Sequence, residues 1–594
     1  MSIIISEIRI VNFRSLRNVR VKLSPNITLL VGANNSGKTT FLRALNIALN
    51  TEEKFISQDD LFINKDGKPL PEGERIIIID VKIVPAGHAI RFDEKWIYDW
   101  TKVFQDRTTG ADFFAFRTEL DFTETIHSAQ INRYYIVDWE NEIANKNDED
   151  KFISDLSNIP FYHIDAQRDL YEETTKRTSD FGKLAGTVEY DEETQKELEE
   201  QLAILNEQAV KDSPVLENLK ENLKSLNKTV QNKGAGVEIT PFPKRVRDLS
   251  KGMKVHFQDG ESDSFGLEYH GMGTRSWASL LTFKAMIEQE AIKKEDDNKL
   301  FHPSLGLEEP EAHLHPNAQR QVYKQLSEIK GQKIISTHSP YIVTQADLSE
   351  LRHFGKDRDE TCIKSIDVKK LNTDEDRKIR REVLPTGDIL FSKAIVLFEG
   401  ETEAQSFPVF ARKYWDAEPF ETGITFIKVN GNNYKPFLLL AKAMQISWFI
   451  FSDYDKKNIK NGIDNALELI GFDKTISHPN VIKLGKPIEE YLIEEGYQDE
   501  LKAGIKNWYL TTISEDTHPK QIDAGQKHVS NYDDPKLLAD IASDNGKVRY
   551  PVYWANEIIL RSGNKCIPLK VRQLFDAIEN ILKINNQESS NAKS

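Results

Sequence analysis

Hydrophobic residues in the first part of the chain gather in short runs rather than at helical spacing. Residues 3–10 and 76–79 are rich in isoleucine, residues 27–31 form a continuous apolar run, and residues 113–122 are rich in phenylalanine. Short apolar runs of this kind predict buried strands. We therefore expect a strand-rich first unit whose aromatic side chains belong to the core rather than to a cofactor pocket.

The region from about residue 170 to 232 changes to a polar and charged helical pattern. Leu198, Leu202, Leu205 and Ala209 recur at intervals of four, three and four residues, which is one face of a helix. A second set, after Pro214, consists of Leu216, Leu219, Leu223, Leu226 and Val230. Heptad-like spacing is typical of a seam between helices. We expect these helices to pair with another subunit, and the alternative is a helical cap on the chain's own domain.

Strands and helices alternate again from about residue 385. Residues 394–398 and 448–451 are short apolar runs, and acidic residues follow each of them. Fully buried parallel strands have this pattern. The last third of the chain is therefore predicted to form a second α/β unit.

Composition narrows the class of protein. The 594 residues suggest about three or four domain-sized units, and 79 basic against 94 acidic residues give a net charge of −15. An acidic total argues against a passive nucleic-acid coat, but it is compatible with an enzyme whose carboxylates hold metal. With only Cys362 and Cys566, we expect no disulfide framework and a reducing, cytoplasmic location. We expect no membrane association, because no apolar run approaches the roughly 18–20 residues of a bilayer span.

Residues 32–39 read Gly-Ala-Asn-Asn-Ser-Gly-Lys-Thr and fit the phosphate-loop pattern G-x-x-x-x-G-K-[ST]. A predicted strand, 27–31, precedes the loop and a predicted helix, 40–49, follows it. Lys38 would reach the β and γ oxygens of a nucleotide, and Thr39 would bind Mg²⁺. The predicted nucleotide-binding residues of this segment are Gly32, Asn35, Gly37, Lys38, Thr39 and Thr40.

A second motif, Leu-Gly-Leu-Glu-Glu-Pro-Glu, occupies residues 305–311 at the end of another predicted strand. Glu308 would hold Mg²⁺, directly or through water, and Glu309 would activate the attacking water. His338 follows the predicted strand 333–335 and suits a sensor of the γ-phosphate. The three motifs together predict a nucleotide-hydrolysing site.

These motifs resemble the ATP-binding-cassette-type ATPases of the SMC, Rad50 and RecF group, and the EEPE-AHLHP segment is most similar to the OLD (overcoming lysogenization defect) family. The resemblance implies that ATP is the nucleotide and that Gln58 is the Q-loop residue. It also implies that residues 271–276, including Ser276, form the signature loop. In this ATPase class the signature of one half completes the site of the other, so a homodimer or higher oligomer is implied.

Acidic residues also follow the strands predicted in the last third of the chain. Glu399 and Glu403 follow the strand at 394–398, and Asp453 and Asp455 follow the next apolar strand. Carboxylates at the ends of adjacent parallel strands converge on one crevice. Several together repel unless divalent cations neutralise them, which is the arrangement of a two-metal phosphodiester hydrolase.

The order E-G-x-T-E, then D-x-D, then I-E-x-Y-L resembles a TOPRIM domain of the OLD kind. The resemblance implies that Glu399 is a metal ligand or general acid/base. It implies a set of further Mg²⁺ or Mn²⁺ ligands, namely Glu403, Asp453, Asp455 and Glu490. Glu489 is the alternative to Glu490, because the motif permits either register. Lys547 resembles the lysine that stabilises transition-state charge, and the alternative for it is a surface lysine.

The resemblance covers nearly the whole chain and is closest to class 2 of the OLD family, which includes the nuclease subunits of Gabija anti-phage systems. It implies an α/β architecture with an ABC-type ATPase at 1–168 and 241–385, a helical dimerisation insert at 169–240, and a TOPRIM domain with C-terminal helices at 386–594. The implied function is a nucleotide-regulated, metal-dependent endonuclease that nicks or cuts double-stranded DNA in anti-phage defence, with a UvrD-like helicase partner. Three alternatives stay open: a DNA-repair ATPase of the SMC or RecF type without nuclease activity, a TOPRIM nuclease acting on RNA such as tRNA, and a topoisomerase or primase.

Overall fold

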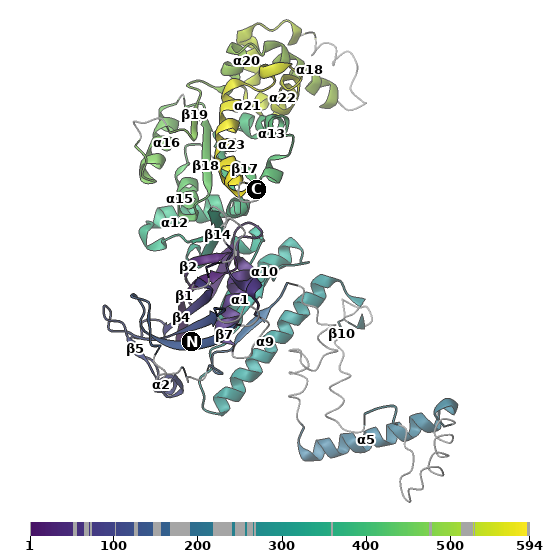
Figure 1. The fold of residues 1–594 in the computed structure, drawn as a ribbon. Helices are drawn as coiled ribbons and strands as arrows, with labels where there is room; N and C mark the ends of the chain where they lie inside the picture. Colours follow the sequence, from purple (N-terminus) through teal and green to yellow (C-terminus); the bar gives the residue numbers. More distant parts are fainter. Residues whose placement is uncertain are drawn as a thin grey trace, which may run out of the picture.

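The structure is a computed structural model of the whole chain (Figure 1). It describes residues 2–50, 56–63, 70–71, 74–100, 102–123, 129–146, 152, 156–166, 190–217, 240–243, 256–257, 265–266, 269–357, 360–429, 431–454, 456–473, 478–512, 527 and 529–590. Three large sheets organise these residues.

The first sheet is antiparallel and is built from the first quarter of the chain. Its order is β2-β1-β4-β6-β7-β8, with β5 paired to β6. The strands are β1 (Ile3–Phe13), β2 (Leu16–Lys22), β4 (Ile76–Pro85), β5 (Phe104–Gln105), β6 (Asp112–Asp121), β7 (Gln130–Asp138) and β8 (Ile143–Ala144). Helix α2 (Glu94–Trp100) lies between β4 and β5 in the chain. The predicted strands at 3–10, 76–79 and 113–122 are confirmed.

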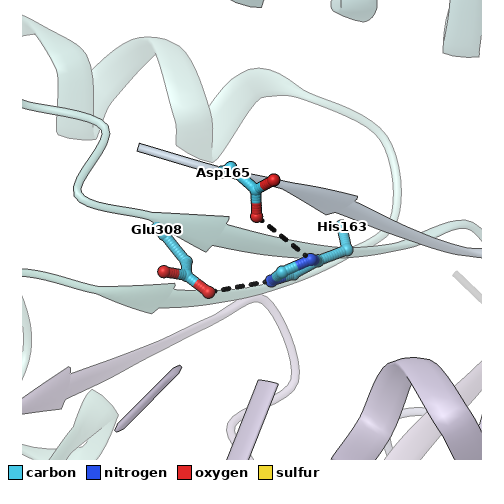
Figure 2. Close-up of side chains that lie close together, drawn as sticks. All are labelled: His163, Asp165 and Glu308. Atoms are coloured by element: carbon cyan, nitrogen blue, oxygen red, sulfur yellow. Dashed lines mark hydrogen bonds and ion pairs between the residues drawn. The ribbon is translucent and has the colours of Figure 1, made fainter. Parts of the chain in front are cut away.

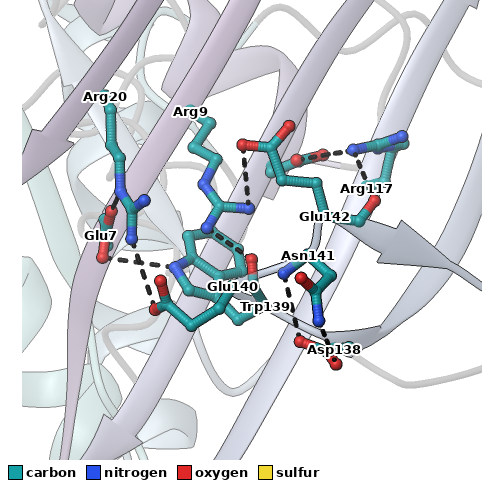
Figure 3. A network of polar contacts seen from close by, with 10 residues as sticks. Glu7, Arg9, Arg20, Arg117, Asp138, Trp139, Glu140, Asn141 and Glu142 are labelled. Atoms are coloured by element: carbon teal, nitrogen blue, oxygen red, sulfur yellow. Dashed lines mark hydrogen bonds and ion pairs between the residues drawn. The ribbon is translucent and has the colours of Figure 1, made fainter.

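A polar network fastens one face of this sheet (Figure 3). The Arg9 guanidinium lies 3.7 Å from the centre of the Trp139 ring and donates a hydrogen bond of 2.6 Å to the Trp139 carbonyl oxygen. Arg117 makes a bidentate pair with Asp80 at 2.8 and 2.9 Å. Both arginines are largely buried, and such charges require partners of this kind. The network therefore fixes the register of β1, β4 and β6 against the β7–β8 turn.

The second sheet is mostly parallel and carries the phosphate loop. Its order is β15-β14-β3-β13-β12-β9, and only β15 runs antiparallel to its neighbour. The strands are β3 (Ile27–Val31), β9 (Phe161–Ile164), β12 (Ser304–Glu308), β13 (Gln332–Ser336), β14 (Leu351–Asp357) and β15 (Glu360–Lys364). Helix α1 (Lys38–Leu49) contacts strands of both sheets and fills the core between them. The predicted strand at 27–31 and the helix after the loop are confirmed.

The third sheet is parallel, with the order β17-β16-β18-β19. Its strands are β16 (Ala394–Phe398), β17 (Ile424–Lys428), β18 (Ser447–Ser452) and β19 (Val481–Lys483). The helices around it are α13 (Glu401–Trp415), α14 (Pro419–Thr422), α15 (Lys435–Met444), α16 (Lys457–Leu469), α17 (Ile488–Glu494), α18 (Gln498–Thr512), α20 (Asp534–Ile541), α21 (Asp544–Arg549), α22 (Pro551–Ile558) and α23 (Leu569–Ser590). The runs at 394–398 and 448–451 form the two central strands, as predicted.

The second and third sheets share one apolar core. Ile395 and Leu397 of β16 join the cluster that contains Leu29 of β3 and Ile335 of β13. The alternate residues of β16, represented by Val396, face a separate cluster made with the C-terminal helices. A strand buried on both faces explains the continuous apolar run. Between β15 and β16 the chain passes through η7 (Val368–Lys370), α12 (Thr373–Lys378), η8 (Ile379–Val383) and η9 (Leu384–Phe391). The elements α10 (Pro316–Glu328), α11 (Pro340–Val343) and η6 (Leu348–Glu350) connect strands of the second sheet.

Two long helices lie outside the sheets. Helix α9 (Met272–Asp296) runs from the nucleotide half, and α5 (Glu192–Lys211) projects away from the sheets (Figure 1). The buried face of α5 consists of Leu202, Asn206 and Val210.

The apolar face predicted for α5 is therefore partly wrong. Leu205 is 51 % exposed, and Asn206 is buried in its place. The Asn206 side chain donates a hydrogen bond from Nδ2 to the Leu202 carbonyl oxygen and accepts one at Oδ1 from the Phe242 N–H. Most of the second predicted helix lies outside the described residues. Within the described part of the chain, the helices are all too short or too polar to cross a bilayer.

Candidate functional site

The phosphate loop connects β3 to α1, and two glycines in left-handed backbone conformations shape it. Gly32 has φ +133° and Gly37 has φ +103°. A Cβ on Gly32 would lie 2.1 Å from the Phe354 carbonyl oxygen, and one on Gly37 would lie 2.8 Å from Thr361 Oγ1. Thr361 also donates a hydrogen bond of 2.9 Å to the Ser36 carbonyl oxygen. The β14–β15 hairpin therefore holds the loop closed, and glycine is required at both positions.

Lys38 begins α1, and its ammonium group folds back into the loop. Its Nζ donates hydrogen bonds of 2.9 Å to the carbonyl oxygens of Gly32 and Ala33. Burial lowers the pKa of Lys38 to about 8, although the nearby Glu309 and Glu311 carboxylates raise it. The ammonium group is therefore charged at neutral pH, and phosphate oxygens would be stronger partners than the two carbonyls.

Adjacent parallel strands bring the acidic motif to this loop. Glu308 ends β12, and Thr39 Oγ1 donates a hydrogen bond of 3.1 Å to its Oε2 atom. Thr40 is half-buried in the first turn of α1. Glu309 has φ +42°, and its Oε1 lies 3.8 Å from His338 Nε2. Burial and the charge of Lys38 lower the pKa of His338 to about 4, so its imidazole is neutral at pH 7.

Two further groups at this edge were not predicted from the sequence. Glu311 is buried, and its Oε1 accepts hydrogen bonds from Thr337 Oγ1 at 2.7 Å and from the N–H groups of His338 and Ser339 at 2.8 and 3.1 Å. It therefore anchors the segment that carries His338. The available signal was its place two residues after Glu309.

The second missed group is His163, at the end of β9. Figure 2 shows its ring between Glu308 and Asp165. Its Nε2 lies 3.0 Å from Glu308 Oε1, and its Nδ1 lies 3.5 Å from Asp165 Oδ1. A single histidine gave no signal in the sequence, because only the pairing of β9 with β12 brings it to Glu308.

Gln58 and Ser276, the expected Q-loop and signature residues, lie in other surroundings. Gln58 is exposed at the start of η1 (Gln58–Asp60), and among the hydrogen bonds of the described residues none joins it to the phosphate loop. Ser276 is buried in the first turn of α9. In that turn, a Cβ on Gly273 would lie 2.5 Å from the His313 carbonyl oxygen. The signature-like segment is therefore packed against the loop that follows Glu311.

The third sheet gathers a second group of carboxylates at its carboxyl edge. Phe398 of β16 pairs with Phe451 of the parallel strand β18, so Glu399 and Asp453 leave their strands on the same side. Ser452 Oγ donates a hydrogen bond of 3.1 Å to Glu399 Oε2. This is the convergence expected at the carboxyl ends of parallel strands.

Glu403 lies in the first turn of α13 and is only 2 % exposed. A Cβ on Gly400 would lie 2.8 Å from Glu403 Oε2, so the carboxylate folds back toward the end of β16. Burial raises the pKa of Glu403 to about 7. The charges of Glu489 and Glu399 add to this rise, whereas Lys547 opposes it.

The structure places Glu489 rather than Glu490 with these carboxylates. Glu489 is 2 % exposed, and its Oε1 accepts a hydrogen bond of 2.6 Å from Thr402 and lies 3.9 Å from Lys547 Nζ. Glu490 is 42 % exposed and pairs with Lys486 at 3.5 Å. Because both residues lie in the first turn of α17, only one of them faces the sheet. The geometry therefore favours Glu489, the alternative that the motif left open, over Glu490.

The chemistry of this second site fits a divalent cation. Glu489 Oε2 is buried and accepts no hydrogen bond in the structure, and an uncompensated buried carboxylate oxygen is costly. A cation bound by Glu399, Glu403, Glu489 and Asp453 would remove that cost and supply a Lewis acid for phosphodiester hydrolysis. Asp455 lies outside the described residues.

Tyr434 is a further member of this site that the sequence did not indicate. It is fully buried at the start of α15. Burial and the negative charge of Glu399 raise the pKa of Tyr434, so its hydroxyl stays protonated at neutral pH.

Comparisons with known proteins agree with this division into two sites. Residues 3–343 match the family model of the AAA ATPase domain, and residues 390–455 match that of the overcoming lysogenization defect protein-like TOPRIM domain. An OLD nuclease from Thermus scotoductus is 25 % identical over 429 residues, which are 67 % of this chain and 71 % of that protein.

Parts of the chain are also similar to solved structures. The C-terminal region of the Xanthomonas campestris pv. campestris OLD protein is 20 % identical, with a TM-score of 0.27 over 34 % of this chain and 98 % of that chain. The SMC head domain from Thermotoga maritima is 14 % identical, with a TM-score of 0.29 over 61 % of this chain and all of the other. The first match spans more than half of the chain, so the chain belongs to the AAA ATPase domain family, and its last third carries a TOPRIM domain like that of the OLD proteins.

Proposed function

We propose that this protein is a metal-dependent endodeoxyribonuclease whose cutting site is the carboxylate group at the carboxyl edge of β16 and β18. The observation that carries the proposal has three parts. Glu399 and Asp453 leave paired strands on the same side, the charges of Glu489 and Glu399 act on the buried Glu403, and the buried Oε2 of Glu489 accepts no hydrogen bond. Mg²⁺ or Mn²⁺ held there would polarise the phosphodiester and generate the attacking hydroxide. Lys547 would offset charge on the transition state.

Positive groups beside the carboxylates support a polyanionic substrate. Lys483 Nζ lies 4.0 Å, and Lys460 Nζ 5.5 Å, from the centre of the Tyr454 ring, and Tyr454 directly follows Asp453. A nucleic-acid backbone needs such cations next to the cutting site. The net charge of −15 does not oppose this reading, because part of that charge belongs to residues that would hold metal.

A DNA-repair ATPase without nuclease activity is the weaker reading. Such a protein would have no use for four mutually repelling carboxylates, one of which has its pKa raised to about 7.

The nucleotide site is proposed to bind ATP with Mg²⁺ and to regulate cutting. The ring of His338 lies 6.0 Å from that of Phe391, centre to centre and tilted by 34°, and Phe391 ends η9 three residues before β16. A movement of His338, the proposed γ-phosphate sensor, could therefore be passed through Phe391 and β16 to Glu399. We infer further that a second copy supplies the signature loop, so that the working unit is a homodimer or a higher oligomer.

Anti-phage defence is the proposed biological role. It rests on the resemblance to class 2 OLD nucleases and to Gabija nuclease subunits, which also suggests a UvrD-like helicase partner. The neighbouring gene tests this role: a helicase gene of that type would support it, and a reverse transcriptase or a toxin-like gene would point to another defence system.

The cutting activity is tested with purified protein, supercoiled plasmid and either Mg²⁺ or Mn²⁺. The expected result is nicked or linear DNA that disappears with chelator and in the variants Glu399→Ala and Asp453→Ala. An RNA substrate, such as tRNA, is incubated in parallel. If only the RNA is cut, the proposed substrate is RNA and not DNA. If both variants nick DNA as fast as the unaltered protein, the proposed cutting site is wrong.

A further inference from the structure

His163 is the one histidine near the phosphate loop whose ring lies between two carboxylates in the described structure. The side chain of His163 is 18 % exposed and that of Glu308 is 14 % exposed, so both are largely buried. Asp165 is the open member of the group at 76 % exposed. The three ligand atoms lie within 4.8 Å of one another.

The spacing of the polar atoms suits shared coordination. Oxygen and nitrogen ligands about 2.1 Å from a cation and at right angles to each other are about 3.0 Å apart. His163 Nε2 and Glu308 Oε1 are 3.0 Å apart, and Thr39 Oγ1 and Glu308 Oε2 are 3.1 Å apart. The threonine of a phosphate loop is itself a metal ligand, so one cation next to Glu308 would be within reach of all three side chains.

The arrangement of the imidazole ring is also that of a metal ligand. Metal-binding histidines commonly direct the second ring nitrogen to a carboxylate, which fixes the tautomer and the ring orientation. Asp165 lies on the Nδ1 side of His163 at 3.5 Å, which leaves Nε2 facing Glu308.

We propose that His163 is a direct ligand of the divalent cation that accompanies the nucleotide, with Asp165 as its positioning residue. The inference rests on the proposed nucleotide binding at Lys38. A nitrogen ligand is better suited to transition metals than to Mg²⁺. The protein is therefore expected to bind nucleotide more tightly with Mn²⁺ than with Mg²⁺.

The test is pulsed electron paramagnetic resonance of Mn²⁺ bound to the full-length protein with ADP or ATP. Coupling to ³¹P shows that the Mn²⁺ lies at the nucleotide, and coupling to nitrogen shows an imidazole ligand. Labelling the protein with ¹⁵N-histidine separates the ring nitrogen of histidine from those of adenine. The variants are His163→Ala, His338→Ala and, as the matched surface control, His313→Ala.

The expected result is histidine nitrogen coupling together with ³¹P coupling in the unaltered protein and in His313→Ala. In His163→Ala the ³¹P coupling remains and the histidine coupling is lost. The nucleotide Kd measured with Mg²⁺, divided by the Kd measured with Mn²⁺, should fall by about tenfold in this variant. Tenfold is the lower end of the affinity loss seen when an outer partner of a metal ligand is removed. Asp165→Asn should lower that ratio in the same direction by less.

Two results would overturn the inference in different ways. In the first, the unaltered protein shows ³¹P coupling but no histidine coupling, or the histidine coupling is lost only in His338→Ala. Nucleotide binding would then stand, and His163 would be a hydrogen-bond partner of Glu308 and not a metal ligand. Absence of ³¹P coupling in the unaltered protein removes the nucleotide site, and the proposed ligand with it.

Discussion

Buried ionisable side chains at the two sites are arranged in opposite ways. At the phosphate loop the buried cation Lys38 is surrounded by backbone carbonyl oxygens, which leave it charged and able to exchange partners. At the β16–β18 edge the buried groups are carboxylates, and burial, with the charges of Glu489 and Glu399, raises the pKa of Glu403. One site is therefore prepared for an anion and the other for a cation.

Lys38→Ala removes the only side-chain ammonium that the structure places inside the loop among the described residues. A hydrogen bond to a charged group contributes about 1.5–3 kcal/mol, so we expect nucleotide affinity to fall roughly 10- to 100-fold. The measurement is nucleotide binding by titration calorimetry. Glu309→Gln is the companion variant and should bind nucleotide but not turn it over; hydrolysis at the unaltered rate by either variant would contradict the assignment.

His353 links the nucleotide half to the third sheet and is 7 % exposed. Burial lowers its pKa to about 4, against hydrogen bonds to the backbone of Met444 and Leu390 that raise it. A lowered pKa means that its stabilising effect is present above the ordinary histidine pKa of about 6.5 and is lost as pH falls toward 4. Between those limits the unfolded state binds the proton more readily than the folded state.

The unaltered protein should therefore lose more stability on acidification than the His353→Gln variant does. The difference in the free energy of unfolding should reach up to ~3 kcal/mol between neutral pH and pH 4. Thermal unfolding midpoints at several pH values measure it, with exposed His88→Gln as the control. Equal acid sensitivity of unaltered protein and His353→Gln would show that His353 is not the sensitive group.

At the scale of elements, the parallel strands are the part of the fold best predicted from the sequence. The bounds of β3 and β16 agree with the apolar runs because these strands are buried on both faces and must be continuously apolar. Helix α9 begins at Met272, so most of the predicted signature loop, 271–276, is helical. The choice of Glu489 over Glu490 could not be made from a motif that allows either register, because it depends on the direction in which α17 enters.

The connection from His338, the proposed γ-phosphate sensor, to the third sheet was not visible in the sequence. Helix α11 follows His338, and a Cβ on Gly387 of η9 would lie 2.6 Å from Pro340 Cβ. This contact and the Phe391 ring join elements that are about 50 residues apart, so no local periodicity predicts them. They make η9 the element through which nucleotide binding would be felt at β16.

Phe391→Ala is predicted to uncouple the two sites. Nucleotide affinity and basal cutting should stay within about threefold of the unaltered protein, since Phe391 lies beside the proposed sensor His338 and is not itself assigned to either site. The effect of added nucleotide on the cutting rate, whichever its sign, should be largely lost. The comparison is the cutting rate with and without nucleotide, and Phe420→Ala, at a phenylalanine that is 76 % exposed, is the matched control. A full nucleotide response in Phe391→Ala would place the coupling elsewhere.

At the scale of the whole molecule, the ATPase and TOPRIM parts share a hydrophobic core and are not separate domains joined only by a linker. The apolar cluster that contains Leu29 and Ile335 continues to Leu438 and Ile463 around the third sheet. A shared core of this kind transmits rearrangements of one part to the other, because packed interiors are not freely deformable. Helix α5, by contrast, stands away from this body, where it is available to a second copy of the chain (Figure 1).

The central claim is that a metal-dependent cutting site lies at the end of β16 and β18 and is completed by Glu489. The neighbouring residues Glu489 and Glu490 offer the most direct test, since they share chemistry and helix but differ in burial. Plasmid nicking is measured with Mn²⁺ for Glu489→Gln and Glu490→Gln, with thermal unfolding to confirm that both variants are folded. Glu489→Gln should lose nicking at least ~100-fold, as expected when a metal ligand's charge is removed, and Glu490→Gln should nick at a nearly unaltered rate. Unaltered nicking by Glu489→Gln, or loss only in Glu490→Gln, would contradict the central claim.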